Sequence, residues 1–239
     1  MPCNSGVSLI PKVHGQQAWF SAGGLYNGLV LLKDAGTGSY WDHITGECVH
    51  GPLKGTQLEY SDYDLLYMTV SAALVSHPHA RLAPSDVRLH HIPLKIAQFL
   101  RGFLGPFLPP HFLTTMGQED DRRARMDLGL GLWTSKTRRY YPVDTIKQAP
   151  DGLFDKVDGQ SVFIYFNALG GAPDAFYTQA DRVVRQDDML QFNTGECLLA
   201  GKLFDVQGQE IVVERPQQMF TRWYGFAFTF PHAEIYGSE

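Results

Sequence analysis

Five side chains that can bind a metal ion or transfer a proton lie within nine positions of the sequence: Asp42, His43, Glu47, Cys48 and His50. On a strand, side chains alternate between the two faces, so Cys48 and His50 would share one face while Glu47 would point to the other. A thiolate and an imidazole are suitable ligands for zinc or copper(I). The spacing therefore predicts part of a metal site whose remaining ligands come from elsewhere in the chain.

Cys3 is the candidate for a further ligand, because it would give the site two sulfurs and one nitrogen. The same three residues could also supply the thiol or metal of an enzyme of unassigned class. The alternative is structural: Cys48 is a small buried residue and His50 ends a hairpin. The remaining cysteine, Cys197, is followed by two leucines and no histidine, which favours this structural alternative. Three cysteines are too few for a disulfide scaffold, and they leave the compartment undetermined.

A second group of side chains could bind a small organic ligand. Its members are Trp41, Asp42, His43, Arg122, Arg125 and Trp133. The two arginines could form a fork for an anionic group, although the mixed-charge run 119–125 is also typical of a solvated surface. The two tryptophans could line a pocket or belong to the core. The common motifs of hydrolases, nucleotide-binding proteins and zinc proteases are absent from the sequence.

The composition sets limits on the architecture that must position these groups. The chain has 239 residues, of which 44% are hydrophobic and 19% charged, as in a folded globular protein. Its 24 glycines and 14 prolines predict many turns and short strands. The net charge of −5 argues against nucleic-acid binding. No apolar run reaches the length of a transmembrane helix, so no membrane span is expected.

Three landmarks occur twice in the same order and at similar spacings. They are Val13-His14-Gly15-Gln16 with Val157-Asp158-Gly159-Gln160, Thr45-Gly46-Glu47-Cys48 with Thr194-Gly195-Glu196-Cys197, and Pro78-His79-Ala80 with Pro231-His232-Ala233. The pattern predicts an internal duplication of residues 13–82 and 157–235, joined by the connection 83–156. Because there are two long copies and not three or more short ones, we expect one pseudo-symmetric domain over 1–239 and not a solenoid.

Each copy is predicted to consist of strands followed by a helix. Apolar runs at 28–33 and 162–166 are typical of buried strands. Ser61 resembles a capping residue, and it predicts a helix that ends before Pro78. In the second copy, a helix is expected between Pro216 and Pro231, with large apolar residues on one face.

The connection is expected to be helical, with an amphipathic helix over 94–104 that packs on the core or contacts a membrane surface. Together these elements predict an α+β fold that is rich in antiparallel β-structure. It would be a single domain built from two pseudo-symmetric strand-then-helix repeats.

The run from Gly38 to Gly55 resembles domain-of-unknown-function family 3179, whose pattern is TGS-x-W, a short spacer with TG, and then GPL-x-G. The likeness extends from the Cys3-Asn4-Ser5-Gly6 motif through Tyr141-Pro142 to the aromatic segment that ends at Pro231. It implies the fold of this family and no particular activity. Members generally have residues upstream of the Cys3 motif, often including a second cysteine. We therefore expect this chain to be truncated at its N-terminus.

These observations favour a domain that binds a metal ion or a small ligand around the first repeat. An enzyme that uses Cys48, His50 and Cys3 is the first alternative, and a purely structural or interaction module is the second.

Overall fold

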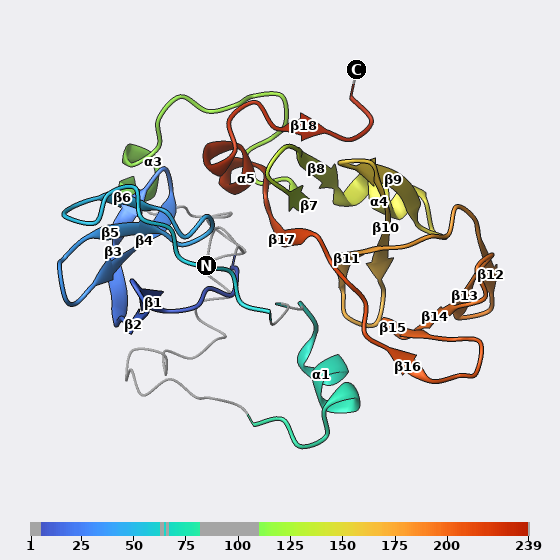
Figure 1. Cartoon of the computed structure of the whole chain (residues 1–239). Helices are drawn as coiled ribbons and strands as arrows, with labels where there is room; N and C mark the ends of the chain where they lie inside the picture. Colours follow the sequence, from blue (N-terminus) through green and yellow to red (C-terminus); the bar gives the residue numbers. More distant parts are fainter. Residues whose placement is uncertain (1–5, 63–64, 66, 82–109, 239) are drawn as a thin grey trace, which may run out of the picture.

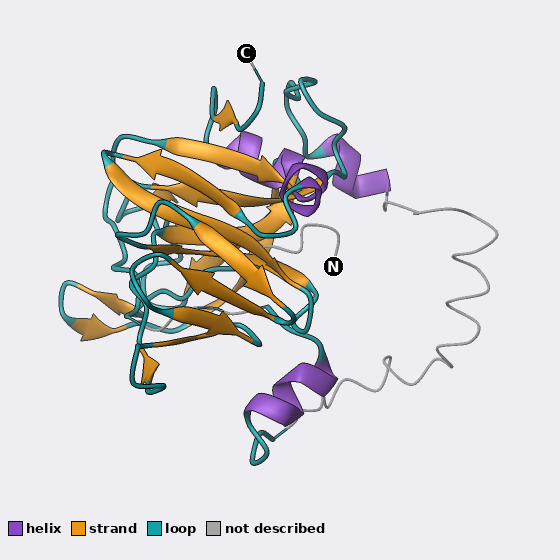
Figure 2. Cartoon of the chain, turned by 90° about the vertical axis from the view of Figure 1, so that its right-hand side faces the viewer, coloured by secondary structure: helices purple, strands orange, loops and turns teal. Residues whose placement is uncertain are grey.

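The computed structural model describes residues 6–62, 65, 67–81 and 110–238, and within them eighteen strands form five sheets (Figure 1). Short helices lie beside these sheets (Figure 2). The predicted class, α+β and rich in antiparallel β-structure, is therefore confirmed. No helix among the described residues has the length and apolar character that crossing a membrane would require.

The N-terminal part forms a small hairpin and a four-stranded sheet. The strands are β1 (Lys12–Val13), β2 (Gln16–Gln17), β3 (Phe20–Tyr26), β4 (Leu29–Asp34), β5 (Tyr40–Asp42) and β6 (Cys48–His50). β1 pairs with β2, and the other four follow one another in the order β3-β4-β5-β6. β4 corresponds to the predicted strand at 28–33. The Asn27-Gly28 turn before it has positive φ at both residues, 51° and 71°, as a tight hairpin requires.

The central sheet combines a hairpin from the connection with two strands from the second copy. The strands are β7 (Leu128–Trp133), β8 (Arg138–Pro142), β17 (Gln217–Arg222) and β18 (Glu234–Ile235), in the order β17-β7-β8-β18. β7 alternates leucine with glycine because aromatic rings cover its glycine positions. A β-carbon at Gly131 would lie 2.3 Å from the ring of Phe226. The connection was predicted to be helical, but it supplies the two inner strands of this sheet.

The second copy, together with β9 at the end of the connection, supplies two further sheets. The three-stranded sheet has the order β11-β10-β9, and the five-stranded sheet runs from β12 to β16 in chain order. Their strands are β9 (Leu153–Val157), β10 (Gln160–Asn167), β11 (Ala172–Tyr177), β12 (Val183–Gln186), β13 (Met189–Phe192), β14 (Cys197–Leu199), β15 (Lys202–Phe204) and β16 (Glu210–Ile211). β10 corresponds to the predicted strand at 162–166.

The described helices are α1 (Val70–Ser76), α3 (Pro110–Thr114), α4 (Val143–Gln148) and α5 (Trp223–Thr229). Two of them are shorter than predicted. α1 begins at Val70, where Thr69 Oγ1 accepts a hydrogen bond from Ala72 N at 3.2 Å, so Thr69 and not Ser61 is the capping residue. The predicted second-copy helix divides into β17 and α5, because alternate residues are buried before Trp223 and nearly all are buried after it. The helix and surface contact predicted at 94–104 lie outside the described residues.

The largest apolar cluster connects the N-terminal sheet with the central sheet. It contains Leu29 of β4 and Ile44, together with aromatic side chains of β7, β8 and α5. Trp223 and Phe226, on α5, are fully buried in this cluster. The first-copy candidates Trp41 and Cys48 belong instead to a separate, smaller cluster with Leu58.

The two copies share local features and differ in how their first strands pair. The Thr-Gly-Glu-Cys segments each join two antiparallel strands, β5 to β6 and β13 to β14, with positive φ at Gly46 and Gly195. The turns His14-Gly15 and Asp158-Gly159 have the same backbone conformation, with φ of 49° and 77° in the first and 51° and 84° in the second. However, β1 and β2 form an isolated hairpin, whereas β9 and β10 belong to a three-stranded sheet with β11. The duplication and its pseudo-symmetry, like the single domain over 1–239, stay predictions.

Candidate functional site

The TGS-x-W motif, residues 37–41, folds around one buried carboxylate that the sequence analysis did not single out, Asp34. Thr37 donates to this carboxylate from its backbone N at 2.6 Å and from its hydroxyl at 2.8 Å. Ser39 N and Trp41 Nε1 donate to it at 3.0 and 3.2 Å. Burial alone would raise the pKa of Asp34, but the hydrogen bonds from Thr37, Trp41 and Ser39 outweigh it and hold this pKa below its ordinary value.

The GPL-x-G motif, residues 51–55, packs against the same cluster. Leu53 N donates to Ser39 Oγ at 3.3 Å. Gly51 has a φ of 105°, and a β-carbon there would lie 2.8 Å from Ser39 Cα, so no larger residue fits. Asp42, in the spacer between the motifs, accepts from the backbone N of Ile44 and of Thr45, each at 2.8 Å. These contacts show that the motif residues hold the loops of the N-terminal sheet in place.

The two described metal candidates do not point to a common position. Cys48 is fully buried in a cluster with Trp41 and Leu58, and its Sγ donates to the carbonyl oxygen of His50 at 3.5 Å. The His50 side chain is exposed and its ring lies beside that of Tyr40, with centroids 6.1 Å apart. Across the described ranges, no three histidine, cysteine, aspartate or glutamate side chains gather as metal ligands would. The predicted zinc or copper site is therefore not supported, and Cys3 lies outside the described residues.

Cys48 is expected to react slowly with thiol reagents in the folded protein. Burial raises the pKa of its thiol, and the side chain has no exposed surface. In a Cys3→Ser background, dithionitrobenzoate should label the half-exposed Cys197 first, and Cys48 at least about 100-fold more slowly, because its reaction requires opening of the core. Mass spectrometry of the quenched reaction identifies each labelled residue. Equal labelling of both cysteines in the folded state would contradict the buried position of Cys48.

The aromatic and histidine candidates occupy core or loop positions. Trp133 Nε1 donates to the Tyr60 hydroxyl at 3.2 Å, and its ring lies 5.3 Å from that of Phe230. His43 is half-buried next to Asp42, and burial lowers the pKa of its imidazole. Trp41, Asp42, His43 and Trp133 do not line either of the two cavities described below. Their role in ligand binding stays a prediction.

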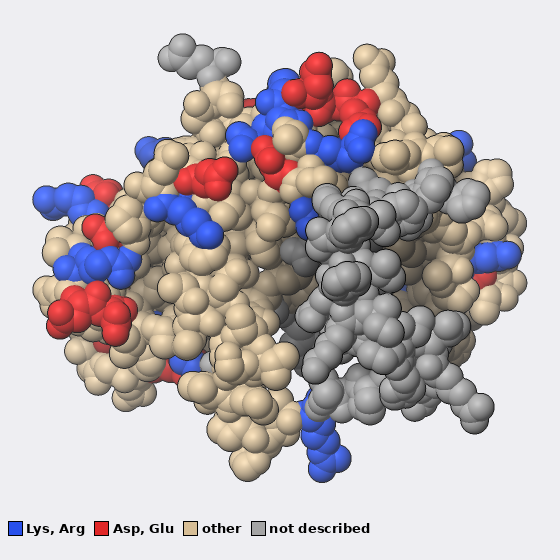
Figure 3. Space-filling model, turned by 180° about the vertical axis from the view of Figure 1, so that it is seen from behind, with Lys and Arg blue, Asp and Glu red and all other residues tan. Residues whose placement is uncertain are grey.

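Arg122 and Arg125 each have a carboxylate partner of their own. Arg122 is 2.6 Å from Asp120 and also donates to the carbonyl of Ala233, whereas Arg125 is 2.5 Å from Glu119. The predicted fork for an anion would require both arginines to exchange these partners for the ligand. Basic and acidic side chains are also intermixed on the face shown in Figure 3.

Arg122 lines an open depression of about 660 Å³ near the C-terminal strand. Arg139 spans this depression and forms ion pairs with Asp155 at 2.5 Å and with Glu234 at 2.6 Å. Its cation is thus neutralised by two carboxylates of the protein.

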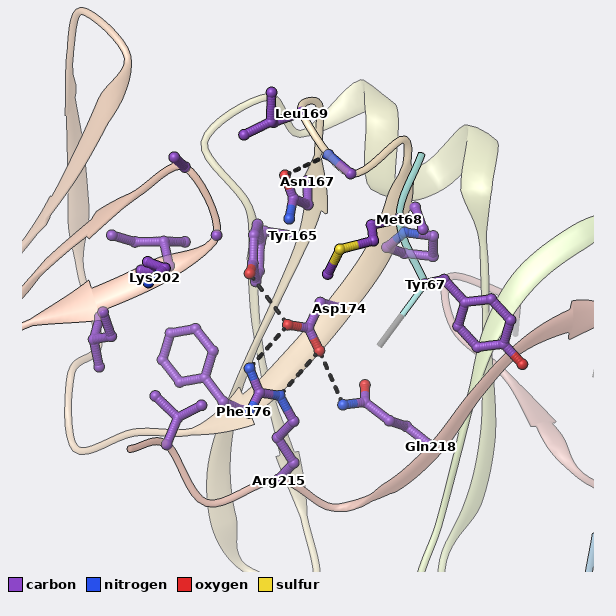
Figure 4. A pocket seen from close by; sticks show the side chains of 18 of the residues that line it. Tyr67, Met68, Tyr165, Asn167, Leu169, Asp174, Phe176, Lys202, Arg215 and Gln218 are labelled. Carbon is purple, nitrogen blue, oxygen red and sulfur yellow. Dashed lines mark hydrogen bonds and ion pairs between the residues drawn. The ribbon is translucent and has the colours of Figure 1, made fainter. Parts of the chain in front are cut away.

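A second cavity, here called the α1 pocket, has a volume of about 260 Å³ and lies among α1, β10, β11, β15, β16 and β17 (Figure 4). Apolar side chains supply most of its wall. They include Met68, Leu130, Leu169, Phe176, Leu203 and Phe220. This cavity has the character of a small-molecule site, since such sites are concave and mainly apolar with a few polar groups.

Three polar side chains of the α1 pocket converge on Asp174 (Figure 4). Arg215 donates to its two carboxylate oxygens from Nε and Nη2, each at 3.2 Å. Gln218 Nε2 donates at 3.0 Å and the Tyr165 hydroxyl at 3.2 Å. The side chains of Asp174 and Arg215 are only 13% and 10% exposed, so this is a buried ion pair at the side of an apolar cavity.

The first copy reaches this pocket through the segment before α1. Thr69 N donates to the carbonyl of Gly170 at 3.0 Å, and the Tyr67 ring meets that of Phe220 edge-on, 5.8 Å away. Sequence reasoning missed the pocket because its residues are separated by long stretches of chain. The signal that could have been noticed is the charged Asp174 within the otherwise apolar segment 172–176, which becomes β11.

The comparisons with known proteins identify the family. The family model described as "Protein of unknown function (DUF3179)" matches residues 2–232. The chain belongs to the DUF3179 family. This result confirms the resemblance inferred from the sequence, and the DUF3179 region contains both the Asp34 cluster and the α1 pocket. No curated protein and no solved structure shows significant similarity to the chain.

Proposed function

We propose that this chain is a binding domain for a small organic ligand and that the ligand binds in the α1 pocket. The observation that carries the proposal is the buried Asp174–Arg215 pair at the side of a mainly apolar cavity. A cavity with apolar walls and a few fixed polar groups can bury the body of a ligand and orient its polar end. The Asp174 network is fixed by Tyr165 and Gln218, so its polar groups are already in position before a ligand binds.

The β5–β6 region of the first repeat gives less support for a ligand or thiol site. Its candidate thiol, Cys48, is buried, and Asp42 already accepts two backbone hydrogen bonds. These contacts favour a structural role for the β5–β6 region within a binding domain. A nucleophilic cysteine instead needs access to its substrate and a lowered pKa.

The proposal is tested by filling the α1 pocket. Leu203 lines the pocket on β15, whereas Leu199, on the neighbouring strand β14, does not and is exposed. The uncharged dye N-phenylnaphthylamine, excited directly, should bind the natural protein saturably at one site. Leu203→Trp should weaken this binding at least about tenfold by occupying the volume, and Leu199→Trp should leave it unchanged.

A second variant, Met68→Trp, fills the pocket from another wall residue. The test can therefore still be made if the Leu203→Trp protein does not fold. Circular dichroism establishes that each variant is folded. The proposal is wrong if the natural protein shows no saturable binding. It is also wrong if folded Leu203→Trp and Met68→Trp proteins bind the dye as tightly as Leu199→Trp.

A further inference from the structure

We infer that the α1 pocket selects an uncharged ligand, with an apolar body and a neutral hydrogen-bonding group. This inference rests on the proposed function, because it specifies the chemical class that the same pocket binds. The reason for the inference is that each acidic side chain of the lining forms an ion pair with a basic one.

The lining contains two carboxylates and two basic groups, which form two separate ion pairs. Arg215 Nη2 lies 3.2 Å from Asp174, and Lys202 Nζ lies 2.7 Å from Glu210. The remaining lining histidine, His77, is exposed at the end of α1. Burial keeps Tyr165 in its neutral form, because it raises the pKa of the phenol well above the ordinary value. The paired groups of the pocket therefore present no net charge to a ligand.

A cationic ligand would find no carboxylate ready to receive it. Both oxygens of Asp174 are engaged, since Arg215 contacts each of them and Ala175 N adds a further hydrogen bond at 2.9 Å. An anionic ligand would have to compete with Asp174 for Arg215. Either charge would lose its hydration on entering an apolar cavity without gaining a full counter-charge, which is costly. A neutral ligand avoids this cost.

Neutral polar side chains are available to contact such a ligand. Asn167 and Tyr165 both line the pocket from β10, on the side opposite to Gln218 (Figure 4). Amide and hydroxyl groups exchange hydrogen bonds with alcohols, amides or amines without requiring a charge. With apolar wall residues such as Leu130 and Phe176, the lining matches a ligand that is mainly hydrocarbon.

The test uses two dyes that differ by one charged group, N-phenylnaphthylamine and its sulfonated analogue anilinonaphthalenesulfonate. For each dye, the binding that Leu203→Trp abolishes is taken as binding in the pocket, and only this binding is compared between the dyes. Binding of the sulfonate elsewhere on the surface persists in the variant and is thereby subtracted. We expect the uncharged dye to bind the pocket at least about tenfold more tightly than the sulfonate.

A variant that changes the charge of the pocket, while the dye stays the same, tests the same inference without a difference in dye shape. Glu210→Gln removes the carboxylate partner of Lys202 at an exposed position, so it should raise the pocket affinity of the sulfonate about threefold or more relative to that of the uncharged dye. Glu214→Gln, which alters an exposed glutamate outside the lining, should change neither.

The outcomes separate the two proposals. If neither dye shows binding that depends on Leu203, the proposed function fails. If pocket binding exists but the sulfonate binds as tightly as the uncharged dye, or Glu210→Gln does not favour the sulfonate, the ligand-class inference alone is overturned.

Discussion

Replacing Asp34 with alanine is expected to lower the free energy of unfolding by about 3–5 kcal/mol, one of the largest effects of any single substitution in the chain. Asp34 is only 4% exposed and accepts hydrogen bonds from Thr37, Ser39 and Trp41. Its removal would take this acceptor from the donors of the buried residues Ser39 and Trp41, and each unsatisfied buried donor has a cost. Urea denaturation followed by tryptophan fluorescence measures the change. Asp121→Ala, at an exposed position, is the control and should shift the free energy by less than about 0.5 kcal/mol.

The contribution of Asp34 should also depend on pH in a defined direction. Because its pKa is lowered in the folded state, its stabilising effect is present above the unfolded-state pKa and is lost as the pH falls through the folded-state pKa. The difference in stability between the natural protein and Asp34→Asn should therefore be constant near neutral pH and shrink below about pH 4. A difference that grows on acidification would contradict the hydrogen-bonded carboxylate.

Replacing Arg215 with methionine is expected to destabilise the protein by about 3–5 kcal/mol, because it leaves Asp174 buried without its counter-charge. The double variant Arg215→Met with Asp174→Leu should recover part of this loss, since two apolar side chains require no pairing, although Tyr165 and Gln218 lose an acceptor. Chemical denaturation of both single variants and the double variant gives the coupling energy.

The exposed pair of Arg185 and Asp151 provides the matched control for this cycle. Its side chains are 41% and 50% exposed. Arg185→Met should cost no more than about 1 kcal/mol, because water screens a surface ion pair. If the two arginine variants had similar effects, Arg215 and Asp174 would not form a buried pair in solution.

Local patterns predicted the parts of the fold that depend on neighbouring residues. The apolar run before Lys33 became β4, and the run after Ser161 lies in β10. The spacing of apolar residues predicted the wrong element where one run of residues fitted both a strand and a helix. Met219, Trp223 and Phe226 fit a helix by spacing, but Met219 belongs to β17, whose partner β7 lies in the connection. A strand that pairs with such a distant segment cannot be recognised from its own residues.

The candidate residues were predicted from their chemistry alone, and burial decided their position. Cys48 and His50 are close in sequence, but the one is in the core and the other is exposed. The Asp34 cluster could have been anticipated, because an aspartate just before a Thr-Gly-Ser turn is well placed to accept from its backbone. The α1 pocket could not, since Asp174 and Arg215 are 41 positions apart and meet only through tertiary structure.

The central hairpin of β7 and β8 obtains both of its neighbouring strands from residues after position 216. Arg139 of β8 meets Glu234 of β18 across 95 residues, and Arg222 at the end of β17 meets Met126 across 96. On a ribosome, the hairpin therefore emerges long before either of its edges can be paired. Contacts between such distant residues form slowly, and unpaired edges can associate with other chains. The interval between synthesis of residues 142 and 217 is thus when we expect a nascent chain to be most prone to aggregate and to benefit from a chaperone.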